Sequence, residues 1–358
     1  MTEEGIDARS RVLLDSLLRA VGPSSYERPA AEIWREAAAE FADVRGDALG
    51  NSFATVNPGG GPRIALVGHV DEIGLLVKHV DPSGVIFVGE IGGWDPAVLV
   101  GQRVTVRTAT GLVPGVVGKA ARHLLSDEER KRAPVVHDLW VDIGASDAAD
   151  AASVVQIGDP IVMAAEPVPL RGRRLASRAL DNRLGALVVL EAARRAAAAG
   201  DLKAEVVAIA SVREETSDSG ARTAAYALDP DIAITLDVTH TDDYPNSNQE
   251  RVTGSRSLGS GPSISRGAAQ HEGIARRLMA VAGDARIPYT LEADGSASWT
   301  DSEAMQDVRA GIPCGLVGIP LRYMHSPSET CDLRDVEQCI DLVARFCRSL
   351  APGEDWTQ

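Results

Sequence analysis

The middle of this chain differs from its two ends in its pattern of predicted strands and helices. From about residue 71 to 165, short β-type runs follow one another, separated by Gly, Pro and Asp. On either side, helical patterns alternate with apolar strands. Alternation is typical of an α/β domain, whereas clustered short strands are typical of a small barrel or sandwich. We therefore expect an open, mixed and mostly parallel sheet flanked by helices over 1–70 and 166–358, interrupted by an inserted small β-barrel over 71–165.

Short apolar runs predict the strands, and apolar residues repeating with the period of a helix predict the helices. The longer apolar strands of the α/β part are expected at 64–68, 206–210, 232–236 and 315–319, with shorter ones at 53–56 and 288–291. Helices are expected after Asp181 and at 10–21, 29–41, 220–228, 270–283, 301–310 and 334–350. Strands of the insert are expected at 85–88, 103–107, 112–117, 139–143 and 160–164.

Ligand-type side chains stand where the buried strands end. His69 and Asp71 follow the strand at 64–68, and the pair Glu214-Glu215 follows the strand at 206–210. The other ligand-type residues are Asp237 and His325, after the next two strands, and Asp181, where a helix begins. In an open α/β sheet, ligands bind outside the carboxyl ends of the strands. We therefore expect these side chains to gather at one edge of the sheet.

Two imidazoles and several carboxylates form a coherent ligand set for a pair of divalent ions. Zn²⁺ and Co²⁺ fit such donors, and Mn²⁺ is a further option. One of the adjacent glutamates can bind an ion while its neighbour takes a proton from the activated water. Taken singly, each residue also has an ordinary explanation: His69 as a hydrogen-bonded histidine, Asp181 as a helix N-cap and Asp237 as a turn residue.

Charge and hydropathy exclude some classes of partner. The net charge is -15, from 36 basic and 51 acidic residues, and this repels nucleic-acid backbones. No apolar run approaches the roughly 18 residues of a membrane span, and acidic residues within the first twenty positions argue against a signal peptide. The four cysteines, all after residue 313, have no zinc-finger spacing. We expect a cytoplasmic protein with reduced, buried cysteines and neither a nucleic-acid nor a membrane partner.

Six separated motifs resemble the TET-type dinuclear aminopeptidases, a family that includes glutamyl and deblocking aminopeptidases and some proteins labelled endoglucanase-like. The motifs occur in the family's order over nearly the whole chain, at 67–74, 179–185, 214–215, 236–240, 300–301 and 319–327. The resemblance implies a zinc-peptidase fold with a PDZ-like barrel as the insert. It also implies dimers that assemble into a dodecamer, with active sites facing an inner chamber.

The resemblance also implies a role for each candidate residue. Asp181 would bridge two metal ions, His69 and Asp237 would complete one ion, and Glu215 and His325 would complete the other. Glu214 would act as the general base. Asp71 would orient His69 from behind. The other histidines receive no ligand role, although His240 is close enough to Asp237 in sequence to lie near the site.

One stretch departs from the family pattern. After the two glutamates the family usually has a string of the type Val-Gly-Leu-Arg-Gly-Ala, whereas this chain has Thr216-Ser217-Asp218-Ser219-Gly220-Ala221. Small polar residues and an added acid thus replace an apolar residue and a base. The ligand set stays intact, and substrate preference is left open.

The leading functional hypothesis is a metal-dependent aminopeptidase that removes N-terminal residues from short peptides. One alternative keeps the site but takes acylated amino acids or other amides. Another is a noncatalytic, metal-stabilised assembly subunit. Glycan hydrolysis is disfavoured, because it normally uses two metal-free carboxylates on either side of the bond.

Overall fold

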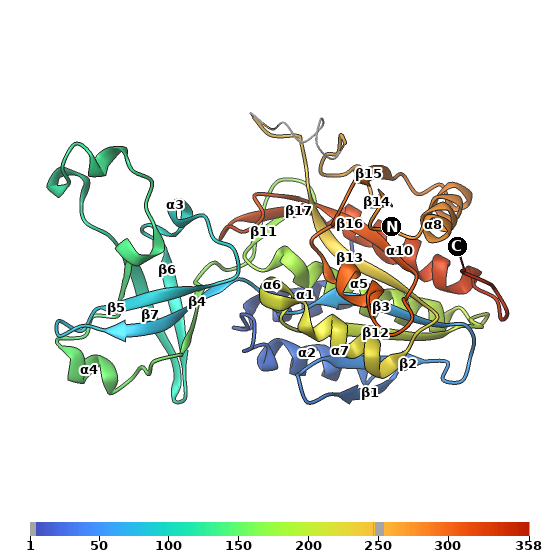
Figure 1. Cartoon of the computed structure of the whole chain (residues 1–358), viewed down its shortest axis with the longest axis horizontal. Coiled ribbons are helices and arrows are strands. Elements are labelled where there is room, and N and C mark those ends of the chain that lie inside the picture. Colours follow the sequence, from blue (N-terminus) through green and yellow to red (C-terminus); the bar gives the residue numbers. More distant parts are fainter. Residues whose placement is uncertain (1–4, 246, 248–253, 358) are drawn as a thin grey trace.

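The computed structural model describes residues 5–245, 247 and 254–357. It has an α/β body and a β-barrel, which lie at opposite ends of the long axis (Figure 1). The body contains one sheet of 11 strands, namely β1 (Asp43–Gly46), β2 (Ser52–Val56), β3 (Arg63–His69), β10 (Val168–Pro169), β11 (Arg174–Ser177), β12 (Glu205–Ser211), β13 (Ile232–His240), β14 (Ser263–Gly267), β15 (Thr290–Asp294), β16 (Cys314–Arg322) and β17 (Glu329–Asp332).

Parallel pairing holds the centre of this sheet and antiparallel pairing its flanks. The order is β1-β2-β12-β3-β13-β16-β17-β11-β10, with β14 joining β16 and β15 joining β14. The contiguous strands β12, β3, β13 and β16 are parallel to one another. Their carboxyl ends therefore lie at the same edge, where an α/β sheet binds its ligands.

Helices cover both faces of the sheet. They are α1 (Ala8–Arg19), α2 (Arg28–Ala38), α5 (Leu180–Ala198), α6 (Glu214–Ser217), α7 (Ser219–Leu228), α8 (Glu272–Ala285), α9 (Asp301–Gln306) and α10 (Leu333–Ser349). In β3, Ile64 and Leu66 pack in the core with α1, α2, α5, α8 and α10, whereas Ala65 and Val67 pack in a second core with α7 and α9. This alternation is the two-residue period of a strand buried on both faces.

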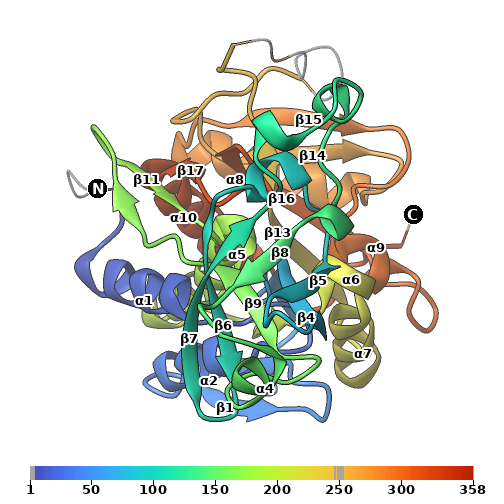
Figure 2. The ribbon, with the colours of Figure 1, turned by 90° about the vertical axis from the view of Figure 1, so that its left-hand side faces the viewer.

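The barrel is closed and entirely antiparallel. Its strands, in the order β4-β5-β8-β7-β6-β9, are β4 (Gly74–Val80), β5 (Ile86–Ile91), β6 (Arg103–Thr108), β7 (Gly111–Gly118), β8 (Trp140–Asp142) and β9 (Pro160–Met163), with the short helices α3 (Pro96–Leu99) and α4 (Ala148–Ala152). Figure 2 looks onto this end of the molecule. A separate apolar core fills the barrel. The expected fold class, a mixed sheet flanked by helices with an inserted β-barrel, is confirmed.

Some elements differ from the expectation. β4, β11, β14 and β17 were not predicted as strands. The helix expected at 301–310 ends at Gln306, and the strand expected at 288–291 runs from Thr290 to Asp294. The sequence of β17, Glu-Thr-Cys-Asp, is mostly polar, yet all four residues are buried. Because most of its buried residues are polar, this strand has no apolar run by which the sequence could have predicted it.

The four cysteines are free and buried, as the sequence predicted. Cys339 and Cys347 lie in α10, whose apolar side packs in the core. In the described part of the chain, no helix combines the length and apolarity needed to cross a bilayer.

Candidate metal-binding active site

The predicted ligands come together at the carboxyl edge of the four parallel strands. His69 is the last residue of β3, and Asp237 lies within β13. Glu214 and Glu215 open α6, directly after β12, and His325 follows β16. Interactions between these side chains, described below, place them in one cluster. The structure therefore brings these predicted residues together at one edge of the sheet.

Two glycines bring Asp181 over the same edge. A Cβ on Gly68 would lie 2.5 Å from the carbonyl carbon of Gly185, and one on Gly185 would lie 2.7 Å from the carbonyl oxygen of Leu236. The Asn182 side chain donates a 2.7 Å hydrogen bond to that same carbonyl. Because only glycine permits so close a backbone approach, the first turn of α5 rests directly on β3 and β13.

Asp181 lies between the two histidines. Its Oδ1 is 3.2 Å from His69 Nε2, and its Oδ2 is 3.4 Å from His325 Nε2. The same two ring nitrogens each face a second carboxylate: Asp237 Oδ1 lies 3.8 Å from His69 Nε2, and Glu215 Oε2 lies 3.4 Å from His325 Nε2. Ligand atoms around one tetrahedral zinc are about 3.3 Å apart, given bonds of about 2.0–2.1 Å. The spacing suits one carboxylate shared between two ions.

Glu214 lies beside this arrangement. Its Oε2 is 3.6 Å from His69 Nε2. Among the described residues, two groups of three potential ligands have their donor atoms within 4.8 Å of one another, and both lie here: His69, Asp181 and Glu215, and His69, Glu214 and Asp237. Glu214 therefore reaches the same space as the predicted ligands.

Asp71 supports the site from behind. It is fully buried, and its Oδ1 lies 3.4 Å from His69 Nδ1. Its two oxygens also accept hydrogen bonds from the backbone N–H groups of Glu214 and Glu215, each at 3.2 Å. One carboxylate thus faces the histidine ring and holds the start of α6.

The electrostatics of the cluster favour a bound cation. Burial raises the pKa values of Glu214, Glu215 and Asp237 well above their usual range, and repulsion from neighbouring carboxylates adds to this. Burial alone would lower the pKa of His69, but the surrounding carboxylates, Glu214 first, raise it well above its ordinary value. Glu215 Oε1 is buried without a hydrogen-bond partner. Divalent ions would relieve this crowding of negative charge.

Glu329, at the start of β17, belongs to the site but was not predicted from the sequence. It is buried, and its two oxygens accept hydrogen bonds from the backbone N–H groups of Asp181 and His325, both at 3.0 Å. It therefore joins the proposed bridging residue to a ligand from another strand. The only sequence sign is its position four residues after His325, inside a polar stretch that resembles a loop.

We expect Glu329→Gln to weaken metal binding by about 10- to 100-fold, the usual effect of removing a group that orients ligands. The amide keeps one acceptor oxygen but offers N–H groups to the second backbone N–H. Chelator competition would measure the affinity, with Glu337→Gln on α10 as the matched control. Unchanged affinity in a folded Glu329→Gln protein would contradict the positioning role.

The barrel also reaches the site. Gly93, in the segment after β5, accepts through its carbonyl a hydrogen bond from the His325 ring. A Cβ at Gly93 would lie 3.5 Å from His325 Nδ1, so this nitrogen faces the barrel. Nε2 is left to face Asp181 and Glu215. The inserted segment thus sets which ring nitrogen is available to a metal.

A cavity of about 720 Å³ opens over the cluster. The atypical stretch contributes Thr216, Ser217 and Asp218 to its wall, and His240 also lines it, as its sequence position allowed. The other histidines without a predicted ligand role do not line this cavity.

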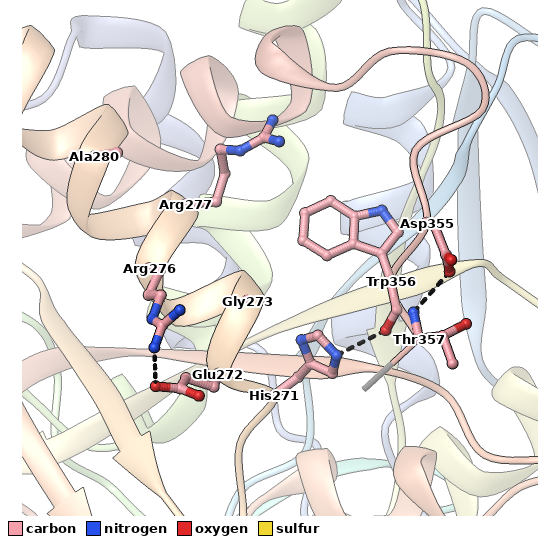
Figure 3. Close-up of a pocket in the computed structure, with 9 residues that line it drawn as sticks. All are labelled: His271, Glu272, Gly273, Arg276, Arg277, Ala280, Asp355, Trp356 and Thr357. Atoms are coloured by element: carbon pink, nitrogen blue, oxygen red, sulfur yellow. Dashed lines mark hydrogen bonds and ion pairs between the residues drawn. The ribbon is translucent and has the colours of Figure 1, made fainter.

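A second hollow, of about 730 Å³, lies near the C-terminal end between α8 and residues 355–357 (Figure 3). Its polar groups pair with one another: His271 Nε2 lies 2.8 Å from the carbonyl oxygen of Trp356, and Arg276 bonds Glu272 at 2.6 Å. Neither group of three potential ligands in the described part of the chain falls here. The chemistry therefore belongs to the edge of the sheet.

Comparison with known proteins places this geometry in context. Residues 50–342 match the family model described as M42 glutamyl aminopeptidase. A lysyl aminopeptidase of Pyrococcus furiosus is 33% identical over 347 residues, covering 95% of this chain and 97% of that protein. The crystal structure of a TET aminopeptidase from a marine sediment archaeon, Thaumarchaeota archaeon SCGC AB-539-E09, is 34% identical with a TM-score of 0.91, and the match covers 96% of each chain. The TET1 peptidase of Pyrococcus horikoshii, which can assemble into a tetrahedron or a large octahedral shell, is 29% identical with a TM-score of 0.85, over 95% of this chain and all of that one.

Proposed function

Because the chain belongs to the M42 glutamyl aminopeptidase family, and is therefore a metal-dependent aminopeptidase, we propose that its sheet-edge site removes N-terminal residues from short peptides with two divalent ions and with Glu214 as the proton carrier. The observation that carries this proposal is the position of Asp181, whose two oxygens face two different imidazoles. A carboxylate in that position suits a two-ion site.

The residues present fit such a pair of ions. His69, Asp237 and one Asp181 oxygen would hold the first, and Glu215, His325 and the other Asp181 oxygen the second. The donors are imidazoles and carboxylates, which suit Zn²⁺ or Co²⁺ and also accept Mn²⁺. The buried Glu215 Oε1, which has no hydrogen-bond partner among the described residues, supports this assignment, since burying a carboxylate oxygen without a partner is costly.

When bound, the ions supply Lewis acidity that lowers the pKa of water and polarises the scissile carbonyl. Three protein ligands leave a fourth position open for water or substrate. Glu214 Oε2 lies 3.6 Å from His69 Nε2, so it would be within reach of a water activated there. It would accept the proton of the attacking water and pass it to the leaving amine. Asp71 would hold the His69 ring and the backbone of Glu214 in place for that transfer.

We also propose the division of labour between the two parts. Residues 1–70 with 166–358 would form the catalytic domain, and 71–165 the domain through which subunits dimerise. Leu112 and Val116 lie exposed on β7 of the barrel, at 61% and 47% exposure, and such apolar surface suits a subunit contact. With structural relatives described as a dodecamer or as a tetrahedron, assembly of dimers into a dodecamer is the proposed state. Four buried, unoxidised cysteines fit a reducing compartment, the cytoplasm.

The test is a substrate panel run on metal-depleted protein refilled with Zn²⁺, Co²⁺ or Mn²⁺. The panel contains aminoacyl amides, N-acyl amino acids and soluble glucans. We expect hydrolysis of aminoacyl amides only, lost with the metals and restored by at least one of them. Faster turnover of N-acyl substrates would favour the amide alternative instead, and metal binding without turnover of any substrate would favour an assembly subunit.

A further inference from the structure

We propose that Trp299 forms a subsite for the second residue of the peptide, the first residue of the leaving product, and that it favours an aromatic or large apolar side chain there. The inference rests on the proposed function and concerns the wall of the same cavity. It arises from an indole that is exposed on a turn held in place by the surrounding structure.

Trp299 combines high exposure with an unusual backbone conformation. Its relative exposure is 88%, and its φ of +57° lies in the left-handed region. A bulky side chain rarely adopts that region, and it persists there only where the surroundings impose it. A single exposed apolar residue is ordinary on a protein surface. An exposed indole on strained backbone in the wall of the active-site cavity is not, and such strain gathers at functional sites.

The turn that carries the indole is fixed on both sides. Before it, the backbone N–H and the hydroxyl of Ser298 donate to one oxygen of Glu303, the hydroxyl at 2.7 Å. After it, the backbone N–H of Thr300 donates to the other oxygen at 3.2 Å. Buried Asp301 accepts a 2.5 Å hydrogen bond from Ser211, the last residue of β12. The Thr300-Asp301 motif therefore anchors the turn to the strand that leads into the active site.

The turn lies at the end of the cavity that α6 forms. Ala304 and Met305 of α9 pack in the second core with Ala221 and Ala224 of α7, which directly follows α6. Figure 2 shows α9 beside α6 and α7. Helix α6 begins with Glu214. In the proposed mechanism this residue passes its proton to the leaving amine, so the leaving peptide starts near α6. The indole is therefore placed beside the leaving peptide.

An exposed indole face suits an apolar or aromatic partner. Aromatic pairs stack or meet edge to face, and any large apolar side chain that covers the ring removes apolar area from water. Because the turn is already fixed, little conformational freedom of the protein would be lost on contact. A phenylalanine or leucine at the second position would cover the indole, whereas glycine offers no side chain. An aminoacyl amide ends before this subsite.

The experiment compares kcat/KM for four substrates of the metal-loaded full chain. Three are amidated dipeptides with phenylalanine, leucine or glycine in second place, and the fourth is the amide of their shared first residue. That first residue is the one whose aminoacyl amide is hydrolysed fastest in the panel above. Amidation removes the terminal carboxylate, so the dipeptides differ only in the second side chain. We expect phenylalanine to exceed glycine by about three- to tenfold, the size of one aromatic contact.

Trp299→Asn should bring the phenylalanine-to-glycine ratio close to one, and should affect the aminoacyl amide less than the phenylalanine dipeptide. Asparagine tolerates left-handed backbone, so the turn is retained while the aromatic face is lost. Trp299→Tyr keeps an aromatic face and should keep most of the ratio. Tyr226→Asn is the matched control and should keep the wild-type ratio, because Tyr226 is 63% exposed on α7 and does not line the cavity.

The outcomes separate this inference from the function it rests on. Equal rates for the phenylalanine and glycine dipeptides in the wild type would overturn the subsite and leave the aminopeptidase intact. A phenylalanine preference that survives in Trp299→Asn would overturn the assignment to Trp299. An equal loss for all four substrates would place the indole at the first residue and overturn the assignment to the second. A changed assembly on gel filtration with the ratio kept would show that a second copy of the chain covers the indole instead. Failure of the wild type to hydrolyse any substrate would overturn the function as well.

Discussion

Glu214→Gln is expected to lower kcat by about 10²- to 10⁴-fold, the usual contribution of a general acid–base group, while the metal content stays at the wild-type level. The Glu214 carboxylate lies 3.6 Å from His69 Nε2 but is not needed to complete either ion, since each already has three protein donors in the proposed arrangement. Glutamine keeps the size of the side chain and loses the ability to carry the proton. Steady-state turnover of an aminoacyl amide and elemental analysis of the same sample measure the two quantities.

Glu215, the neighbour of Glu214, provides the most direct comparison for the Glu214→Gln variant. Glu215→Gln alters a proposed ligand, so it should lower both metal content and activity, whereas Glu214→Gln should lower activity alone. Glu272→Gln, an exposed glutamate paired with Arg276 on α8, controls for the chemical change and should behave like the wild type. Wild-type turnover by a correctly loaded Glu214→Gln protein would show that another group carries the proton.

Asp181→Asn is expected to reduce both ions and to bring activity to the background of the assay. The reason is that, among the described residues, Asp181 alone has an oxygen within 4.0 Å of each of the two histidines, Oδ1 near His69 and Oδ2 near His325. Asparagine offers one neutral oxygen and an NH₂ group that cannot bind a cation. Metal-to-protein stoichiometry after gel filtration and turnover with excess metal are the measurements.

The matched control for this variant is Asp201→Asn, at an exposed ion pair with Arg348. It should keep metal and activity, because surface ion pairs contribute little. If Asp181→Asn lost only one ion and kept the other at full occupancy, Asp181 would be a ligand of a single ion and not a bridge.

Most of the proposed site residues could be predicted from the sequence because they lie at the ends of strands that the sequence also predicts. β3, β12, β13 and β16 contain long apolar runs, and the ligand residues lie at or just beyond those runs. Glu329 was not predicted because it lies in a buried strand of mostly polar residues, which shows neither an apolar run nor an alternation of apolar and polar residues. Its role depends on two backbone N–H groups at 181 and 325, and such a contact exists only after folding.

The insert shows the same limit. Short β runs among Gly, Pro and Asp predicted a barrel, but its first strand, β4, was not predicted. The hydrogen bond between Gly93 and His325 joins residues more than 200 positions apart, and no local pattern marks it. The sequence thus predicted the proposed donors and Asp71, but not Glu329 and Gly93.

That contact has a consequence for modularity. The barrel leaves the body a few residues after His69, where β4 begins at Gly74, and touches it again through Gly93 at His325. An enzyme trimmed to its α/β body would lose the Gly93 carbonyl that faces the ring of His325, one of the two histidines proposed as ligands. The barrel is therefore not an appendage that can be exchanged freely between relatives. A transplanted insert would have to reproduce the segment around Gly92 and Gly93 before its outer surface could be redesigned.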